Sequence, residues 1–163
     1  VIISTVEGTR PMLLELQALV APTNFGMARR TSTGVDFNRV ALLLAVLEKR
    51  IGLQIQNQDV YINVVGGIKI NEPSIDLGIV IAVASSFRNI PIASDVVVTG
   101  DVGLTGEIRA VSYIEKRIAE CKKLGFKKIV IPRNNYEAVK DVKGIEIIPV
   151  DNLRQAINIV LRG

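Results

Sequence analysis

The sequence predicts one α/β domain that spans residues 1–163. In the second half, strand-like runs at 128–132 and 145–148 alternate with helical patterns, the last of them an amphipathic helix at 151–161. This alternation is typical of α/β proteins. A chain of 163 residues that is 48% apolar and 22% charged is also long enough to bury a sizeable core.

The first third of the chain predicts a hairpin, a polar loop and a long helix. Two strands flank the turn at residues 7–11, and a flexible polar loop follows at 24–34. Asp36 is a candidate helix N-cap, and Gly52 is the expected residue just past the helix end. Apolar residues recur at helical spacing between these two positions, so we expect a helix there.

The middle third predicts a buried helix among short strands. A strand is expected at 60–70, interrupted by two glycines, and shorter strands at 95–99 and 107–109. The run at 75–84 is apolar on nearly all sides, so periodicity alone cannot separate a buried helix from a buried strand. The Pro-Ser start and the length of the segment favour the helix.

The last third carries start and stop signals. Ser112 and Glu115 have the spacing of a capping box, and Gly125 is placed to end the helix that they open. Pro149 is expected to end the last strand, because proline cannot donate to a ladder. Asp151 is the expected N-cap of the final helix.

The residue types that are missing exclude several kinds of chemistry. The chain has no histidine, so neither a Ser-His-Asp triad nor a Cys-His pair can form, and most catalytic zinc sites are excluded. The sequence has no Gly-rich P-loop ending in Lys-Ser or Lys-Thr, so we expect no ATP bound in that mode. We therefore expect no metal and no cofactor in this domain.

The composition also suggests a compartment and a kind of partner. One cysteine, Cys121, excludes an internal disulfide and fits a reducing cytoplasm. No apolar run reaches the roughly 18–20 residues of a membrane span, so we expect no membrane contact. The first residue is Val1 rather than methionine, and we expect a piece of a longer protein. A formal charge of +4 and a pI near 9.4 suggest, weakly, an anionic partner.

Residues 72–117 resemble the proteolytic domain of Lon, an ATP-dependent bacterial protease. Glu72-Pro73-Ser74 stands where Lon has its Gly-Pro-Ser nucleophile, and residues 99–106 stand in the place of its Thr-Gly-Glu strand and turn. The resemblance puts the catalytic lysine of the family at Arg117. It implies a Lon-like mixed α/β (α+β) fold of the ribosomal-protein-S5-domain-2-like architecture.

Arginine at this position changes the chemistry that the resemblance implies. A Ser/Lys dyad needs a base that can be neutral near pH 7, and a buried lysine can lose its proton. Arginine stays protonated in proteins, so Arg117 cannot take a proton from Ser74. We therefore expect no catalytic residues, with Ser74 and Arg117 as vestiges of a dyad.

Two interpretations of Ser74 stay open: a nucleophile at a helix start, or a plain helix N-cap. The cap is favoured because the base is missing. Two lysines could in principle replace it, but Lys116 is rotated by about 100° from Arg117 on the helix and Lys69 is expected in solvent. Asp76, where Lon has glycine, suggests an ion pair with Arg117.

Several segments, four of them outside the Lon-like part, resemble the bacterial DNA-repair family RadA, also called Sms. They are residues 6–11, 15–20, 33–39, 45–50 and 103–109. In that family a zinc finger and a RecA-like ATPase precede a Lon-like domain, so zinc and ATP with magnesium are expected only in those other domains. The resemblance implies a cytoplasmic homo-oligomer, a hexameric ring, that drives branch migration on single-stranded or branched DNA in homologous recombination. It also implies a recombinase among the partners.

Basic residues are the candidates for DNA contact. They lie in the polar loop, on the first helix, and on and after the helix that carries Arg117: Arg29, Arg30, Arg39, Lys116, Lys122, Lys123 and Lys127. Each could contact a phosphate. The alternative is a solvated helix face balanced by Glu115 and Glu120. Four Phe and three Tyr are too few for a base-stacking platform, so any DNA contact is expected at the backbone.

Gly100, Gly103 and Gly106 recur at every third position. A phosphate-cradling loop is conceivable, but tight turns between short strands explain the spacing better. The sequence as a whole favours a non-proteolytic scaffold domain of a RadA-type DNA repair ATPase. Two alternatives stay open: a Ser74-dependent peptidase, and a degenerate module that binds peptides without cleaving them.

Overall fold

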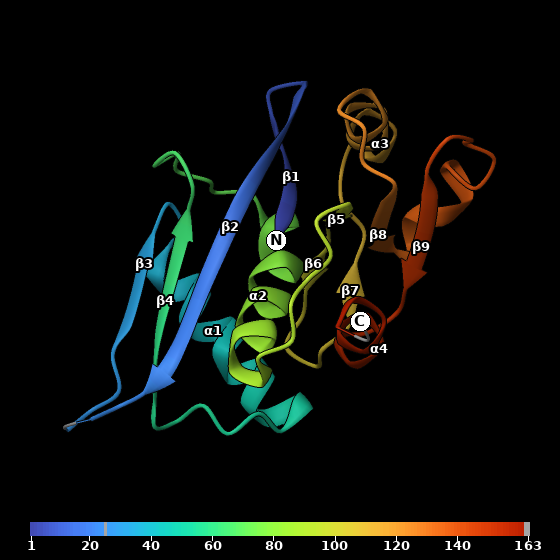
Figure 1. The fold of residues 1–163 in the computed structure, drawn as a ribbon. Coiled ribbons are helices and arrows are strands. Elements are labelled where there is room, and N and C mark those ends of the chain that lie inside the picture. Colours follow the sequence, from blue (N-terminus) through green and yellow to red (C-terminus); the bar gives the residue numbers. More distant parts are fainter. Residues whose placement is uncertain (25, 162–163) are drawn as a thin grey trace.

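A computed structural model describes residues 1–24 and 26–161. Its centre is a mixed sheet of seven strands in the order β3-β4-β2-β1-β5-β8-β9, with a separate two-stranded ribbon, β6-β7 (Figure 1). The strands are β1 (Ile2–Glu7), β2 (Arg10–Pro22), β3 (Arg30–Thr33), β4 (Gln58–Val64), β5 (Val96–Val98), β6 (Asp101–Val102), β7 (Ile108–Arg109), β8 (Lys128–Pro132) and β9 (Glu146–Val150). The α-helices are α1 (Phe37–Val46), α2 (Asp76–Arg88), α3 (Ile114–Lys123) and α4 (Leu153–Val160). The α/β prediction is confirmed.

The chain also contains three short helical segments that are not α-helical. A π-helical turn, η1 (Leu47–Ile51), extends α1, and 3-10 turns form η2 (Pro73–Ile75) before α2 and η3 (Arg133–Ala138) after β8. The predicted N-cap and end of the first helix are both confirmed: Asp36 accepts a hydrogen bond from the Arg39 N–H, and Gly52 has a left-handed φ of 82°.

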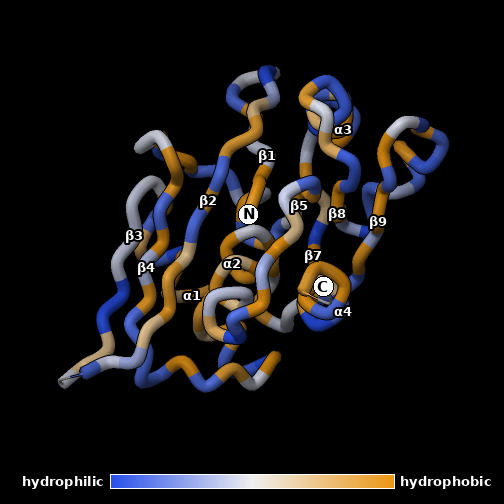
Figure 2. Tube along the Cα trace, viewed as in Figure 1, coloured by the Kyte–Doolittle hydropathy of each residue, from blue (hydrophilic) through white to orange (hydrophobic). Residues whose placement is uncertain are grey.

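Two hydrophobic clusters hold helices against the two faces of the sheet. The larger cluster packs α1, α2 and α4 against one face and includes Leu16, Leu43, Ile79 and Ile157. The smaller cluster lies under α3 and includes Ile118. Figure 2 shows hydrophobic residues along β1 and hydrophilic ones at the β1–β2 turn. The buried helix that periodicity alone could not identify is α2, whose residues from Asp76 to Ala84 are all buried.

Gly78 sets how closely α2 approaches the sheet. A Cβ atom on this residue would lie 2.3 Å from Cγ2 of Ile3, which is far inside van der Waals contact. A side chain at this position would therefore push α2 away from β1. Because Ser74 lies just before α2 and Ser4 lies on β1, this close contact also brings together the groups of the candidate site.

Several element boundaries differ from the predictions. The loop predicted at 24–34 contains β3, which pairs in parallel with β4, and β4 itself ends at Val64 rather than continuing through the glycines. Phe25, in that loop, lies outside the described residues. Pro149 lies inside β9 opposite Ile131, because β9 is the edge strand and its outward side needs no donor.

Two predicted helix caps are also wrong. Ser112 does not cap α3, whose N-cap position is held by Tyr113 at a left-handed φ of 55°. The N-cap of α4 is Asn152, whose side chain accepts a hydrogen bond from Gln155 N–H, while Asp151 pairs with Arg133 instead. In both places the helix begins one residue later than predicted; at α3 no side chain caps the first turn, whereas at α4 the neighbouring Asn152 takes the capping role.

Candidate functional site: a buried serine facing an arginine

Ser74 lies buried in η2, between β1 and the segment that follows β5. Its Oγ donates to the Ser4 carbonyl oxygen at 3.2 Å, and its own carbonyl accepts from Gly100 N–H at 2.9 Å. The predicted N-cap role is wrong: the residue at the cap position of α2 is Ile75, and no side chain caps it. Ser74 lies in the 3-10 turn η2, one residue before the N-cap position of α2, and its hydroxyl points into the core.

Arg117 reaches Ser74 from α3 and is fully buried. Its Nη1 lies 3.1 Å from Ser74 Oγ and 3.0 Å from the Ser4 carbonyl oxygen, and its Nε donates to the Ser112 carbonyl oxygen at 2.8 Å. The sequence therefore identified the right pair of positions. We name the group formed by the buried Ser4, Ser74 and Arg117 and the partly buried Glu72 the Ser74–Arg117 pocket.

Glu72 supplies the negative charge in this pocket. Its carboxylate forms an ion pair with Arg117 and accepts hydrogen bonds from Thr5 Oγ1 and Val6 N–H, both at 2.7 Å. Burial favours the neutral acid, but the hydrogen bonds from Val6, Arg117 and Thr5 outweigh it and hold the pKa of Glu72 below its usual value. The predicted pairing of Arg117 with Asp76 is wrong, because Glu72 takes that place.

Asp76 belongs to a neighbouring cluster. It is completely buried and forms an ion pair with Arg39, whose Nε lies 3.0 Å from Oδ1, and it accepts from Val102 N–H at 3.1 Å. Arg39 also reaches Asp101 at 3.1 Å. Burial raises the pKa of Asp76 to about 6, against the opposing hydrogen bond from Arg39. The cluster ties α1, α2 and β6 together.

Neither of the two lysines that could replace the base is hydrogen-bonded to Ser74 within residues 1–24 and 26–161. Lys116 Nζ donates to the Thr9 carbonyl oxygen at 3.1 Å and lies 5.3 Å from the centre of the Tyr113 ring, so it points away as predicted. Lys69 is exposed, also as predicted. A small cavity of about 150 Å³ next to Ser74 is lined by Glu72, Asp101 and Ser112, among others. The group at bonding distance from the serine hydroxyl is thus a cation that cannot accept a proton.

The basic candidates fall into two groups in the structure. Arg30 donates to the carbonyl oxygens of Ile55 and Gln58, and Arg39 is held by carboxylates, so both serve contacts within the chain. The other five are exposed: Arg29, Lys116, Lys122, Lys123 and Lys127.

The fold adds a lysine to this set that the sequence did not single out. A Cβ on Gly144 would lie 3.2 Å from Cε of Lys122, so the neighbouring Lys143 comes to the same end of α3. Lys143 is exposed. The two lysines are 21 positions apart, so no spacing in the sequence could reveal this approach.

Gly103 and Gly106 form the turn between β6 and β7, as predicted, whereas Gly100 lies in the link between β5 and β6. Gly103 N–H donates to the Glu107 carbonyl oxygen at 2.9 Å, and Gly106 N–H to the Gly103 carbonyl oxygen at 3.0 Å. Gly106 has a left-handed φ of 82°, which favours glycine. Among residues 1–24 and 26–161 no three His, Cys, Asp or Glu side chains gather as a metal site would need. In the same part of the chain, no helix has the length and apolar character to span a membrane.

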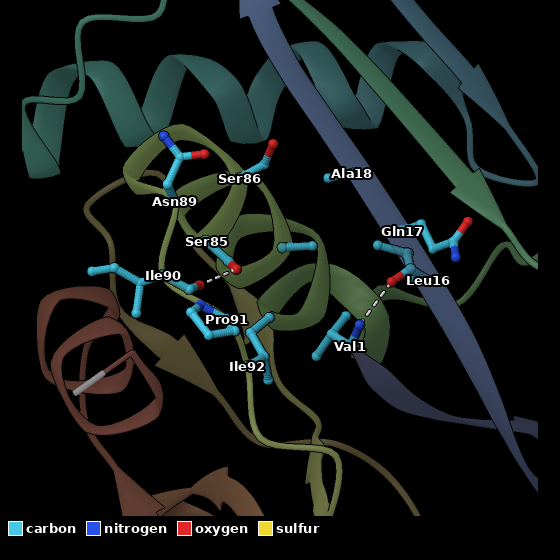
Figure 3. A pocket seen from close by; sticks show the side chains of 11 residues that line it. Val1, Leu16, Gln17, Ala18, Ser85, Ser86, Asn89, Ile90, Pro91 and Ile92 are labelled. Carbon is cyan, nitrogen blue, oxygen red and sulfur yellow. Dashed lines mark hydrogen bonds between the residues drawn. The ribbon is translucent and has the colours of Figure 1, made fainter. Parts of the chain in front are cut away.

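A wider cavity of about 500 Å³ lies elsewhere, between the second half of β2 and the segment after α2 (Figure 3). β1 begins opposite Glu15, so residues further along β2 have no β1 neighbour. The cavity is lined mainly by apolar and small polar residues, including Ala18, Ser86 and Ile92. It contains none of the predicted site residues.

The fold and the Ser74–Arg117 pocket together indicate the class of protein to which this domain belongs. A serine at the start of a buried helix, facing a basic side chain from the helix after the β6-β7 ribbon, is the arrangement expected of a Lon-type proteolytic domain. Residues 44–163 match the model of the Lon protease (S16) C-terminal proteolytic domain, and the chain belongs to this family.

The chain is also similar to DNA repair proteins named RadA. It is 54% identical over 162 residues to the protein of Bacillus subtilis (strain 168), an alignment covering 99% of this chain and 35% of that protein. For RadA of Streptococcus pyogenes serotype M1 the identity is 50% over 159 residues, covering 98% and 35%. For Listeria monocytogenes it is 49% over 156 residues, covering 96% and 34%. The chain spans about a third of the length of these relatives, and the resemblance predicted from the sequence is confirmed.

Proposed function

We propose that this chain is a non-proteolytic, Lon-type scaffold domain of a RadA-type DNA repair ATPase. The observation that carries the proposal is the hydrogen bond between Arg117 Nη1 and Ser74 Oγ, at 3.1 Å, in a pocket where Glu72 neutralises the arginine. Serine hydrolysis needs a base that removes the hydroxyl proton. Here the position of the base is filled by a permanent donor, and the serine donates its own proton to the Ser4 carbonyl oxygen.

Hydrolysis assays test this first part. The chain and its Ser74→Ala variant are incubated with fluorescently labelled casein, and an active Lon protease serves as the positive control. We expect no difference between the two chains. Hydrolysis by the wild type that Ser74→Ala abolishes would show a working nucleophile and overturn the proposal. The double variant Glu72→Gly/Arg117→Lys restores the first glycine and the lysine of the Lon pattern but leaves Asp76, and it tests whether a lysine base is enough to activate Ser74.

The scaffold role includes assembly into a ring, which we propose to be hexameric. An uncovered part of the sheet supports it: Leu19 on β2 is 58% exposed and pairs across the strands with Tyr61 on β4, which is 38% exposed. Exposed apolar side chains on a sheet face are suited to burial against another copy. In sedimentation velocity we expect Leu19→Lys to shift the chain toward monomer. The matched Gln17→Lys, two residues away on the same face, should shift it less, and equal behaviour of the two variants would argue against this surface.

The proposed DNA contact is to the phosphate backbone. Three exposed lysines support it, Lys122 and Lys123 in the last turn of α3 and Lys127 just after it, because no described carboxylate lies within 4 Å of their nitrogens. Each phosphate contact releases counterions, so binding should weaken with salt.

We further propose that zinc and ATP with magnesium are bound by other domains of the longer protein. We also propose that the protein acts in the cytoplasm in recombination, and that a recombinase is a partner.

Fluorescence anisotropy with a labelled oligothymidine tests the DNA contact. The variant Lys122→Gln/Lys123→Gln is compared with Lys69→Gln/Arg88→Gln, which removes the same charge from exposed residues elsewhere. We expect the first variant to bind more weakly and to lower the slope of log K against log salt by about 1.4, from about 0.7 per contact on single strands. Equal slopes for the two variants would remove α3 from the interface.

A further inference from the structure

The central sheet contains a gap beside the second half of β2. In the order of the strands β1 lies between β2 and β5, but β1 pairs with only the first half of β2. The ladder ends at Val1, whose amino group donates to the Leu16 carbonyl oxygen at 2.9 Å and whose carbonyl oxygen accepts from Leu16 N–H at 2.8 Å. Beyond this pair, the place between β2 and the segment that leads into β5 is the cavity of about 500 Å³ in Figure 3.

The edge of β2 that borders this gap has a backbone position open for pairing. Alternate residues of an antiparallel strand direct their N–H and C=O groups to the same side, so Ala18 faces the gap as Leu16 faces Val1. None of the described residues of β1 lies opposite Ala18. The next N–H on this side, that of Val20, donates to Ser86 Oγ at 2.9 Å, which closes the edge. An unpaired stretch of strand edge is a template for another strand.

The cavity has room for an apolar side chain on the α2 face of the sheet. Its lining contains no charged side chain, and small residues such as Ala18, Ala82 and Ser85 leave the space open. The Ser85 hydroxyl already donates to the Ile90 carbonyl oxygen. Ala18 and Val1 both pack against the larger hydrophobic cluster, so a strand that continues β1 would direct every second side chain to the same cluster.

The environment of Val1 suits a continuous backbone. Burial lowers the pKa of the Val1 amino group, and the nearby Glu15 carboxylate opposes this shift without cancelling it. A peptide N–H in the same place would keep the hydrogen bond to the Leu16 carbonyl oxygen and would carry no charge that has to be desolvated.

We propose that the gap is a strand-addition site, and that its occupant is the stretch of the longer protein that leads into Val1 and extends β1 along Ala18. This inference rests on the proposed function, in which the domain is part of a longer RadA-type protein. The register of β1 and β2 places the second residue before Val1 opposite Ala18, with its side chain toward Ala82. We expect an apolar residue there, and not proline, because its N–H bonds to the Ala18 carbonyl oxygen.

A strand added at this place makes the junction between domains rigid. It is held by β2 on one side and by the segment that leads into β5 on the other, so the connection to the ATPase domain is part of the sheet and not a flexible linker. β1 also carries Ser4, which contacts both Ser74 and Arg117. A displacement of the preceding domain is therefore passed directly to the strand that lines the Ser74–Arg117 pocket.

Hydrogen–deuterium exchange resolved at single residues tests the inference by comparing the 163-residue chain with the longer protein. In the 163-residue chain we expect the Ala18 amide to exchange at least tenfold faster than the Leu14 amide, which lies opposite Ile3 in the ladder. In the longer protein we expect Ala18 to slow at least tenfold, toward the rate of Leu14. The Leu19 amide faces β4 and is the internal control, which should be slow in both proteins.

A cavity-filling variant shows whether the protection comes from the gap. Ala82→Leu in the longer protein places a larger side chain where the added strand packs, so we expect it to return Ala18 to fast exchange, by at least tenfold. The matched control is Ala119→Leu, at an exposed position of α3, which should leave the exchange of Ala18 unchanged. Circular dichroism checks that both variants are folded.

The other outcomes overturn the inference in different ways. Equal exchange of Ala18 in the two proteins means that the preceding stretch does not dock, and the hydrolysis and DNA tests of the proposed function are unaffected. Slow exchange of Ala18 in the 163-residue chain that becomes faster on dilution means that a second copy fills the gap. An encoded protein with nothing before Val1 would overturn both the inference and the proposed longer protein.

Discussion

Arginines in this protein occupy two opposite environments. Arg117 is fully buried, and its guanidinium is bonded to Glu72, Ser74 and the Ser4 and Ser112 carbonyl oxygens. Arg50 and Arg154 are exposed, and within residues 1–24 and 26–161 their side chains donate hydrogen bonds to backbone carbonyl oxygens. A buried charge must be paired to be tolerated, whereas an exposed one is free to bind an anion. The Ser74–Arg117 pocket therefore acts on stability, whereas Arg50 and Arg154 are expected to contribute little to it.

Removing the buried charge should produce the largest effect. Arg117→Met leaves Glu72 partly buried without its cation, and we expect a loss of about 3–5 kcal/mol in the free energy of unfolding. Urea denaturation followed by circular dichroism measures it. The double variant Glu72→Gln/Arg117→Met should recover part of the loss, because the unpaired charge is gone. Losses that simply add in the double variant would contradict the pairing.

The pH dependence of the neighbouring Asp76 gives the next largest effect. Its pKa in the folded chain, about 6, exceeds the ordinary value of 3.8, so the folded state binds the proton more tightly. The contribution of this group to stability is therefore fully present below about pH 3.8 and is lost as pH rises through about 6. The upper limit of this loss is about 3 kcal/mol.

Comparing the Asp76→Asn variant with the wild type isolates the contribution of Asp76 to the pH dependence of stability, because Glu72 titrates in both chains. The pKa of Glu72 is lowered, so its contribution has the opposite sign: it is present above pH 4.5 and lost as pH falls through the folded value. We expect the difference in unfolding free energy between the two chains to change between pH 4 and pH 7. A difference that stays constant over this window would mean that Asp76 remains ionised throughout.

The exposed arginines should give the smallest effect on stability. Arg50→Gln and Arg154→Gln remove charges that have no carboxylate partner among the described residues, so we expect each to change the free energy of unfolding by less than about 0.5 kcal/mol. The same urea experiment measures it. A loss of several kcal/mol would show that these residues support the fold, and the contrast between the two regions would disappear.

The parts of the fold that the sequence predicted depend on local patterns. The β1–β2 hairpin, α2 and β8 follow from apolar runs and from turn or breaker residues that lie within a few positions. β3 was missed because its four residues, Arg30–Thr33, are polar and are held by parallel pairing with β4, some thirty positions away. Contacts of that kind leave no periodic signal in the segment itself.

The sequence predicted which two residues face each other in the site, but not which carboxylate pairs with the arginine. The Lon pattern placed Ser74 and Arg117 together, and the structure brings them within 3.1 Å. The sequence suggested Asp76 as the partner of the arginine because both residues depart from the Lon pattern. The 3-10 turn of η2 instead directs Glu72 toward α3, while Asp76 faces Arg39 of α1. Both carboxylates are two residues from Ser74, so only the backbone path decides between them.

The ion pair between Glu72 and Arg117 also constrains how these two positions can change in evolution. Replacing either residue alone leaves a charge without its partner in or near the core. A protein in which only one of the two residues has been replaced would therefore be less stable until the second residue is replaced as well. We therefore expect Glu72 and Arg117 to be inherited together. A return to the glycine and lysine of the Lon pattern would need two substitutions, each of which destabilises the protein when it occurs alone.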